Sequence, residues 1–295
     1  MSGPPRPSRP GPALGKIGVW LNPRYDDDTR VRFVASAEAM GYPAAWLGFG
    51  SASVGDLSLA ERALDATTTI TVATAIVNMW TNKPDVVARA YHRITARHGD
   101  RFLLGLGIGH PESVSAYQRP LDTMAAYLDA LDTAGVPKDR RILAALGPRA
   151  LQLAAARTSG THPYLVVPDH TREARHLLGP GVIIAPEHKV VLTADAAAAR
   201  GIGRQFLAEP YLKLRNYTSN LRRYGYTDQD MTGGGSDHLI DALVLHGSTD
   251  DVAARLHSHL DAGADHIAIQ VLGPDTADPL PAYRKLAVSL GHGQE

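Results

Sequence analysis

Short apolar runs alternate with amphipathic stretches of helical period along nearly the whole chain, and this alternation limits the possible folds more than any other feature. It is typical of repeated βα units around a parallel sheet. Because no linker interrupts the 295 residues, we predict an α/β fold with a single (β/α)8 TIM barrel. The predicted strands are 16–21, 44–47, 70–77, 101–108, 142–146, 163–167, 189–192 and 266–272.

Signals for helix starts and ends lie between these strands. They are Thr29 before a helix over 30–40 that stops at Gly41, Pro84 before 85–97, and Thr249 with Asp250 opening a helix that ends at Gly263. A longer stretch, 196–246, separates the seventh and eighth predicted strands and contains the run GGGSD. We expect this stretch to form an excursion over the catalytic face of the barrel.

Composition narrows the choice of partners. The chain has 30 basic and 30 acidic residues, so no bulk field favours nucleic acid or an anionic membrane. It has no cysteine, which excludes disulfides, thiolate catalysis and cysteine metal sites. Residues 1–14 are rich in proline and lack the apolar core of a signal peptide, so we expect a disordered tail before one domain over 15–295. We also expect a cytoplasmic homodimer that binds a small-molecule substrate.

The stretch RFLLGLGIGHPES, 101–113, places glycines on alternate residues at the end of an apolar run. A dinucleotide fingerprint requires a different glycine spacing and an immediate helix, and here Pro111 follows His110. In a barrel, the same residues lie at the carboxyl end of the fourth strand, where active sites are built. The glycines either admit a flat ligand close to the backbone or only relieve crowding inside the barrel.

A second candidate site is ALGPRALQLAAARTSG, in which Gly147 and Pro148 begin an alanine- and leucine-rich helix. Free backbone N–H groups and the dipole at such a helix start suit a phosphate, and Arg149 can add a charge. A Gly-Pro pair before a helix is also a common cap without ligand.

Four segments together resemble the luciferase-like superfamily, and within it the oxidoreductases that use the deazaflavin coenzyme F(420), typical of actinobacteria. They are TAIVNMWTNKP at 74–84, RFLLGLGIGHP at 101–111, ALGPRALQLAAARTSGTHPYLV at 145–166 and HLDAGADHIAIQVLG at 259–273. The resemblance extends from Gly15 to about Leu290.

The resemblance implies that the coenzyme lies at the carboxyl end of the barrel. Backbone amides at the start of the helix would hold its phosphate, and a bulge in the third strand with a non-prolyl cis peptide would support the ring. Asn78 would bond a ring carbonyl, and the end of the fourth strand would lie beside the ring. The implied cofactor residues are Ala75, Ile76, Asn78, Gly107, Ile108, Gly109, Gly147, Arg149 and Ala150.

His110 is the candidate proton donor, because some relatives carry a glutamate there and an imidazole titrates near neutrality. A structural histidine is the alternative. The acid that relatives present after the second strand is missing, since this chain has Phe49 and Gly50. The remaining histidines show no metal-ligand spacing, so we predict no metal. The candidate substrate-pocket aromatics are Trp20, Phe49, Trp80 and Tyr117.

These observations favour a reductase that passes hydride from reduced F(420) to a conjugated C=C or C=N bond of a small metabolite. An F(420)-reducing dehydrogenase of an alcohol or sugar is an alternative. A sugar phosphate would need cations, for which the long excursion offers Lys213, Arg215, Arg222 and Arg223. An FMN-dependent monooxygenase on the same fold is the runner-up, and a barrel that only binds the coenzyme is the third hypothesis.

Overall fold

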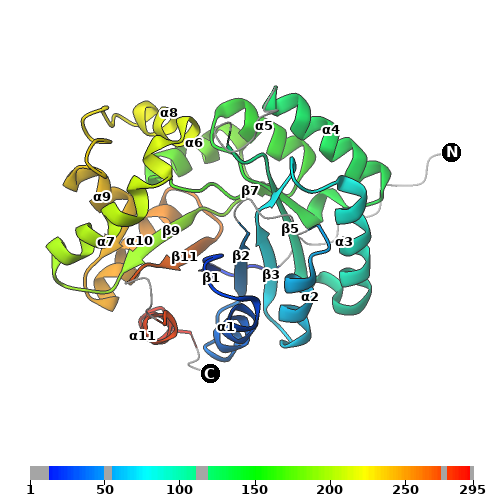
Figure 1. Cartoon of the computed structure of the whole chain (residues 1–295), viewed down its shortest axis with the longest axis horizontal. Coiled ribbons are helices and arrows are strands. Elements are labelled where there is room, and N and C mark those ends of the chain that lie inside the picture. Colours follow the sequence, from blue (N-terminus) through cyan, green and yellow to red (C-terminus); the bar gives the residue numbers. More distant parts are fainter. Residues whose placement is uncertain (1–12, 50–54, 111–118, 274–277, 293–295) are drawn as a thin grey trace.

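The computed structural model describes residues 13–49, 55–110, 119–273 and 278–292. Parallel strands form one curled sheet with helices packed outside it, a TIM-barrel-like α/β fold (Figure 1). The strands are β1 (Ile17–Leu21), β2 (Ala44–Gly48), β3 (Thr71–Ala75), β4 (Val77–Asn78), β5 (Phe102–Gly107), β6 (Arg141–Leu143), β7 (Gly160–Thr161), β8 (Ile183–Ile184), β9 (Glu187–Val191), β10 (Val244–His246) and β11 (Ile267–Val271).

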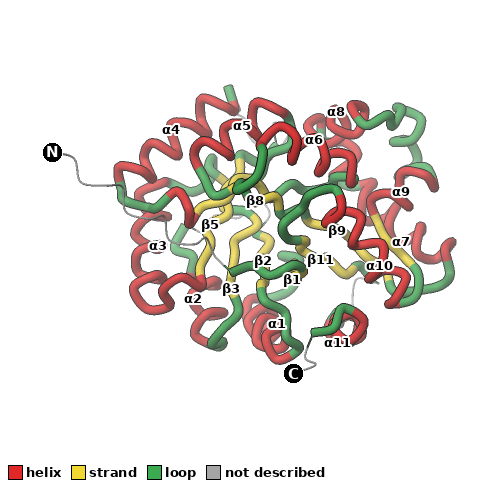
Figure 2. The backbone as a smooth tube through the Cα atoms, turned by 180° about the vertical axis from the view of Figure 1, so that it is seen from behind, coloured by secondary structure: helices red, strands yellow, loops and turns green. Residues whose placement is uncertain are grey.

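The sheet order is β10-β9-β11-β1-β2-β3-β5-β6-β7-β8, with β4 paired to β5. Every pairing is parallel, as in β1 against β11, where Ile17 faces Ile267, and β1 against β2, where Trp20 faces Trp46. Only two residues, Ala185 and Pro186, separate β8 from β9. Both continue the backbone hydrogen bonding of the sheet, because Ala185 N donates to Thr161 O on one side and Ala268 N donates to Pro186 O on the other. The sheet therefore curls so that segment 183–191 lies between β7 on one side and β11 on the other (Figure 2).

The helices alternate with the strands and form the outer layer (Figure 2). They are α1 (Asp27–Ala39), α2 (Ser58–Asp65), α3 (Pro84–His98), α4 (Pro120–Thr133), α5 (Pro148–Arg157), α6 (Pro168–Leu178), α7 (Ala196–Ala208), α8 (Arg215–Arg223), α9 (Asp237–Leu243), α10 (Thr249–Asp261) and α11 (Leu280–Ser289). Between β9 and β10, the chain forms α7, a short 3-10 turn at Tyr211–Lys213, α8 and α9.

Several sequence predictions need correction. The predicted strand 163–167 is a buried loop, because Leu165 has a φ of 60° that breaks the extended backbone, and the strand lies earlier, at β7. The predicted third strand is interrupted at Ile76. Strands β8 and β10 were not predicted at all.

Helix caps also differ from the prediction. Helix α1 begins at Asp27, and the side chain of Asp26 caps it by accepting from Thr29 N, so Thr29 lies inside the first turn. Ser248 caps α10 in a reciprocal box with Asp251, where the prediction had named Thr249 and Asp250. The starts at Pro84 and Pro148 agree with the prediction.

Three clusters of buried side chains hold these layers together. The largest lies between the strands and the outer helices, and another packs α7, α8 and α9 around β9 and β10. The third fills the barrel interior, where Trp20 and Trp46 are surrounded by small residues such as Ala44, Ala73 and Ala268. Trp46 is fully buried, and the small neighbours give its ring room at interior packing density.

Candidate active site

A cavity of about 580 Å³ opens at the carboxyl ends of the strands, which is the position of active sites in this class of barrel. It is bounded by the ends of β1, β3, β4 and β5, by the start of α5, and by the segment around the start of α8. This volume suits a ring-sized ligand with a short side chain.

All nine predicted cofactor residues line this one cavity, although they come from three separate segments of the chain. They are Ala75, Ile76, Asn78, Gly107, Ile108, Gly109, Gly147, Arg149 and Ala150. The peptide bond between Ala75 and Ile76 is cis, at the position that the resemblance implies. The side chain of Asn78 is buried, and its Oδ1 accepts from Trp80 N at 2.9 Å.

The glycines of β5 are explained mainly by protein packing. A Cβ on Gly105 would lie 1.8 Å from Thr74 O, and one on Gly107 would lie 2.8 Å from the side chain of Ile76. Gly109 has a φ of 66°, and a Cβ there would lie 2.7 Å from Asn78 Nδ2. Relief of crowding, one of the two interpretations that the sequence left open, is therefore sufficient to account for these three glycines.

Gly147 differs from them, because a Cβ there would meet no atom within 4 Å. It precedes α5, which has proline in its first turn, no side-chain cap and no acidic residue in that turn. The N–H of Leu151 is already bonded to Gly147 O. The amides of Arg149 and Ala150 thus remain at the positive end of the helix, beside the cavity, where an anionic group would be stabilised.

His110 lies on the cavity wall at the end of β5, next to the start of α8. Its Nδ1 lies 3.1 Å from Asn216 Oδ1, and its ring is 5.2 Å from that of Tyr217. An amide oxygen only accepts, so Nδ1 carries the proton in this bond and Nε2 is the nitrogen that would exchange a proton with a ligand. The start of α8 therefore orients the imidazole.

Of the four predicted substrate aromatics, the three that the structure describes do not share one cavity. Trp20 lines the cavity. Phe49 belongs to the buried core, where the Arg30 guanidinium lies 5.2 Å from its ring centroid, and Trp80 packs against the same core; neither is among the cavity-lining residues. Tyr117 lies outside the described residues.

Sequence reasoning missed an aromatic wall made by Tyr164, Tyr211 and Tyr217. Tyr164 Oη lies 3.1 Å from Tyr211 Oη and 3.0 Å from Gln270 Oε1. Because an amide oxygen accepts, Tyr164 donates to Gln270 and Tyr211 donates to Tyr164. The only sequence signal for this wall was the aromatic content of the long excursion, which supplies two of the three rings.

A buried ion pair lies behind this wall. Lys189 Nζ is 2.7 Å from Glu187 Oε2, and both side chains are almost completely inaccessible. The ammonium also lies 3.8 Å from the ring centroid of Tyr164. Burial raises the pKa of the Glu187 carboxyl and lowers that of the Lys189 ammonium, so each charge depends on the other.

The basic residues that the sequence offered for a phosphate do not line the cavity. Lys213 pairs with Glu209, Arg222 with Asp228, and Arg223 with Glu173. None of them, and not Arg215 either, is among the cavity-lining residues. Among the described residues that line the cavity, Arg149 carries the only formal charge.

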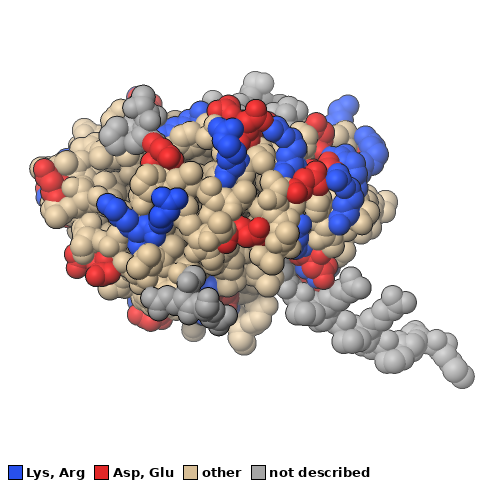
Figure 3. All heavy atoms as spheres, turned by 90° about the horizontal axis from the view of Figure 1, so that it is seen from below, with Lys and Arg blue, Asp and Glu red and all other residues tan. Residues whose placement is uncertain are grey.

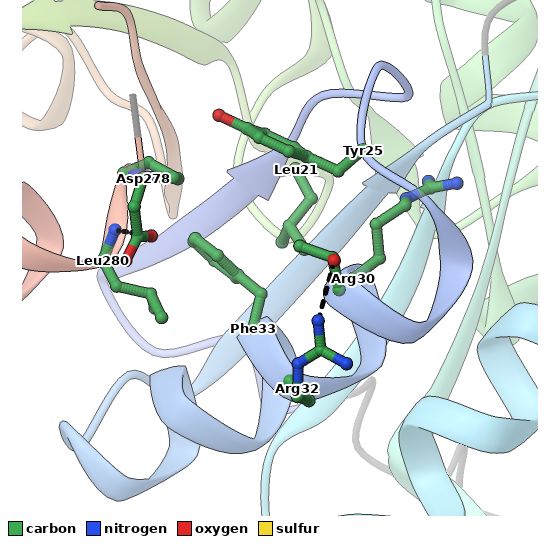
Figure 4. Close-up of a pocket in the computed structure, with 9 residues that line it drawn as sticks. Leu21, Tyr25, Arg30, Arg32, Phe33, Asp278 and Leu280 are labelled. Atoms are coloured by element: carbon green, nitrogen blue, oxygen red, sulfur yellow. Dashed lines mark hydrogen bonds between the residues drawn. The ribbon is translucent and has the colours of Figure 1, made fainter. Parts of the chain in front are cut away.

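A smaller cavity of about 350 Å³ lies between α1 and the start of α11 (Figure 4). Its polar groups are largely bonded within the protein. Arg30 Nη2 donates to Gly48 O, Arg32 Nη2 donates to Thr29 Oγ1, and Leu280 N donates to Asp278 Oδ1. It contains none of the predicted site residues, so we place the candidate site in the larger cavity.

Basic and acidic side chains are interspersed over the face seen in Figure 3, in keeping with a net charge of zero. Within the described ranges, no three histidine, aspartate or glutamate side chains lie together as a metal site. No helix in the described part of the chain has the length and apolar character needed to cross a membrane.

The fold and the cavity thus define a TIM-barrel-like α/β protein with a cavity at the carboxyl ends of its strands. Residues 14–134 match the family described as luciferase-like monooxygenase. No curated protein sequence matches the chain.

Similar solved structures agree with this fold. An F(420)-dependent secondary alcohol dehydrogenase in complex with an F(420)-acetone adduct has a TM-score of 0.74 at 12% identity, covering 94% of this chain and 99% of that one. A coenzyme F(420)-dependent tetrahydromethanopterin reductase from Methanopyrus kandleri has 0.70 at 15%, covering 94% and 99%. The FMN complex of the oxygenating constituent of a diketocamphane monooxygenase from Pseudomonas putida has 0.69 at 14%, covering 95% and 98%.

Proposed function

We propose that the chain is an F(420)-dependent oxidoreductase that transfers hydride from the reduced deazaflavin to a conjugated C=C or C=N bond of a small metabolite. One observation carries the proposal. The uncapped start of α5, the backbone at Ala75 and Ile76 and the end of β5 border one cavity of about 580 Å³. The match to the luciferase-like family and the two F(420)-dependent neighbours support it.

The residues present fit such a coenzyme. The amides of Arg149 and Ala150, with the guanidinium of Arg149, would hold the phosphate, because Gly147 leaves open space before them. The backbone at Ala75 and Ile76 would support the ring. Asn78 Oδ1 is occupied by Trp80 N, which leaves the Nδ2 group of Asn78 as the donor for a ring carbonyl.

The deazaflavin supplies the hydride when bound, because it has carbon in place of the central ring nitrogen of flavin. The protein would position the substrate, exclude water from the cavity and supply a proton. Tyr164, Tyr211 and Tyr217 exclude water from one side of the cavity. His110, held by Asn216 through Nδ1, would deliver a proton from Nε2 in its doubly protonated form.

The charge pattern of the cavity favours a neutral acceptor as substrate. Arg149 is the only charged side chain among the described lining residues, and it lies at the phosphate end. A substrate with its own phosphate would need a second cation, and the excursion's Lys213, Arg222 and Arg223 are engaged in ion pairs away from the cavity. We therefore rank reduction of a neutral metabolite above oxidation of a sugar phosphate. A cytoplasmic homodimer is part of the same proposal.

An FMN-dependent monooxygenase is the second candidate. It is favoured by the description of the family that residues 14–134 match and by the FMN-bound neighbour. FMN has a ring and a phosphate that would use the same cavity features, so geometry alone does not separate the two coenzymes. A protein that only binds the coenzyme would share these features but would lack turnover.

Binding separates the coenzymes. Titration of the purified chain by fluorescence quenching and calorimetry should give at least about tenfold tighter binding of F(420) than of FMN, a free-energy difference of about 1.4 kcal/mol or more. A preference for FMN would replace the proposal by the monooxygenase. Turnover of reduced F(420) with unsaturated ketones and imines, and of oxidised F(420) with alcohols, then separates an enzyme from a carrier.

A further inference from the structure

Glu187 and Lys189 lie on the same face of β9, because side chains at alternate positions of a strand point to one side of the sheet. That side is the barrel interior, where the Lys189 ammonium lies 3.8 Å from the ring centroid of Tyr164. His188, between them, points to the outer helices, since its Nδ1 lies 3.0 Å from Nε2 of His259 in α10. The proposed function gives the buried ion pair no role.

Three aromatic rings lie near the ammonium. Besides Tyr164, the ring centroids of Phe206 and Tyr211 lie 5.5 and 5.9 Å from Lys189 Nζ. These distances fall within the range of about 6 Å over which a cation is attracted to a ring. An ammonium has three N–H donors, and Glu187 is its one hydrogen-bond partner within the part of the chain that the structure describes. The rings are therefore the electron-rich neighbours left for the other two donors.

Tyr164 is held at two points. The Lys189 ammonium lies against its ring, and its hydroxyl lies 3.0 Å from Gln270 Oε1. Gln270 is the register partner of Lys189 in the pairing of β11 with β9, so one strand pair supplies both contacts. Tyr164 itself lies in the loop between β7 and α6, where side-chain contacts and not strand pairing position its ring.

Ring contacts continue from Tyr164 to His110. The centroid of Tyr211 lies 5.4 Å from that of Tyr164 and 5.7 Å from that of Tyr217. Tyr217 in turn lies 5.2 Å from the His110 ring. These four residues line the cavity, whereas Lys189 is not among the described residues that do. A displacement of Tyr164 or Tyr211 would therefore change the wall that leads to the proposed proton donor.

Stability alone does not account for the ion pair. Both side chains are almost completely inaccessible, and apolar side chains of similar volume in place of such a pair often leave stability unchanged or raise it. A methionine at position 189 would fill similar space, but its flexible thioether adapts to its surroundings and specifies ring positions less well. The ammonium instead holds a charge at a fixed point beside the rings.

We propose that Lys189, held by Glu187, is a positioning residue that fixes Tyr164 and Tyr211 as a wall of the substrate position. The inference rests on the proposed function for its ligand, because the wall adjoins His110, which is assigned to protonate the substrate. A fixed wall keeps a flat, neutral acceptor in one orientation relative to His110. Loss of the ammonium should weaken binding of the substrate and spare the coenzyme, whose phosphate is assigned to the start of α5.

The first test needs neither coenzyme nor turnover. It compares the wild type with the double variant Glu187→Gln with Lys189→Met, which removes both charges. In protein labelled with ¹⁵N-lysine, the Nζ resonance that the double variant loses should be that of an ammonium at pH 7. In protein labelled with ¹³C-tyrosine, the rings of Tyr164 and Tyr211 should flip several-fold faster in the double variant, with assignments from the loss of each signal on substitution by phenylalanine.

Val190→Ala is the matched control. Val190 lies on the same strand, points to the other face and is buried in the core between the strands and the outer helices. Its truncation should lower stability and leave both tyrosine rings unchanged. A neutral amine at Lys189, equal ring flipping in the wild type and the double variant, or the same acceleration in Val190→Ala would overturn the positioning role.

The second test asks whether the wall acts on the substrate, with 2-cyclohexenone as a flat, neutral probe and reduced F(420) as coenzyme. The double variant should raise KM about 3- to 10-fold, the size expected for lost ring contacts, with kcat and F(420) affinity nearly unchanged. Val190→Ala should not change KM. An unchanged KM in the double variant, or weaker F(420) binding in its place, overturns the assignment to the substrate and leaves the proposed function standing. If the wild type reduces neither this ketone nor the other acceptors, the proposed function fails and the ring-flip measurement decides the positioning role alone.

Discussion

Nδ1 of His110 lies 3.1 Å from Oδ1 of Asn216, which is 106 residues further along the chain. The contact joins the end of β5 to the start of α8, so the excursion after β9 positions a residue of the barrel. It also assigns Nε2 as the nitrogen that would exchange a proton. The proposed role of His110 can therefore be tested with variants of His110 itself and of its partner Asn216.

His110→Ala is expected to lower the rate of the chemical step by at least about tenfold, since general acid help is typically worth a factor of about 100 to 10,000. Coenzyme affinity should change little, because the imidazole is not assigned to the phosphate or the ring. His110→Glu should restore part of the rate with a lower pH optimum, because carboxylates titrate below imidazole. Single-turnover stopped-flow across pH measures both effects.

Asn216→Ala provides the companion variant. It keeps the imidazole and removes the acceptor at Nδ1, so the rate should fall less than in His110→Ala and the pH profile should move. A wild-type rate and pH profile in His110→Ala would make His110 structural and assign the proton to solvent or another group.

Gly147→Asp tests the phosphate site. A carboxylate placed before the amides of Arg149 and Ala150 should repel the phosphate and weaken coenzyme binding by about 1 to 3 kcal/mol. Gly201→Asp in α7 is the matched control, because a Cβ there also meets no atom within 4 Å and Gly201 is not among the cavity-lining residues. Calorimetry on both variants gives the comparison, and equal affinities in the two folded variants would move the phosphate elsewhere.

The sequence predicted the side of the candidate site that is assigned to the cofactor, but not the side that includes Tyr211 and Asn216. Ala75, Asn78 and Gly107 are the last residues of strands, and Gly147 directly precedes a helix. The carboxyl ends of parallel strands must meet at one end of a barrel. Tyr211 and Asn216, which lie between the end of α7 and the second residue of α8, also line the cavity. No local periodicity indicates that position, so these residues could not be predicted.

His162 and the loop after it show another limit of sequence patterns. Residues 163–167 are apolar and buried, and this composition predicted a strand. An apolar composition indicates that a segment is buried, but it does not show that the backbone is extended. The positive φ of Leu165 makes this segment a loop. Phe49 is the reverse case, since its position after a strand suggested a pocket residue but its ring packs under Arg30 in the core.

Glu187→Gln is expected to destabilise the fold by about 3 to 5 kcal/mol, because it leaves the Lys189 ammonium buried without its partner. The double variant Glu187→Gln with Lys189→Met should recover most of the loss, since both charges are then gone. Asp85→Asn, which breaks the exposed pair with Arg89, should leave the urea midpoint nearly unchanged. A Glu187→Gln variant as stable as the wild type would show that Glu187 and Lys189 are both uncharged in the fold.

Buried histidines should make the protein sensitive to mild acid. Burial lowers the pKa of His162 to about 3 and the pKa values of His259 and His266 to about 4, whereas an unfolded histidine titrates near 6.5. Between these values the unfolded chain binds more protons than the folded one, so stability is full above about pH 6.5 and falls as the pH decreases. From pH 7 to pH 5, each such histidine should remove about 1 to 2 kcal/mol from the free energy of unfolding. Urea unfolding at intervals of pH measures this slope, and His266→Gln should flatten it by the share of one histidine. A free energy of unfolding that stays constant from pH 7 to pH 5 would mean that these imidazoles are solvated or already protonated in the fold.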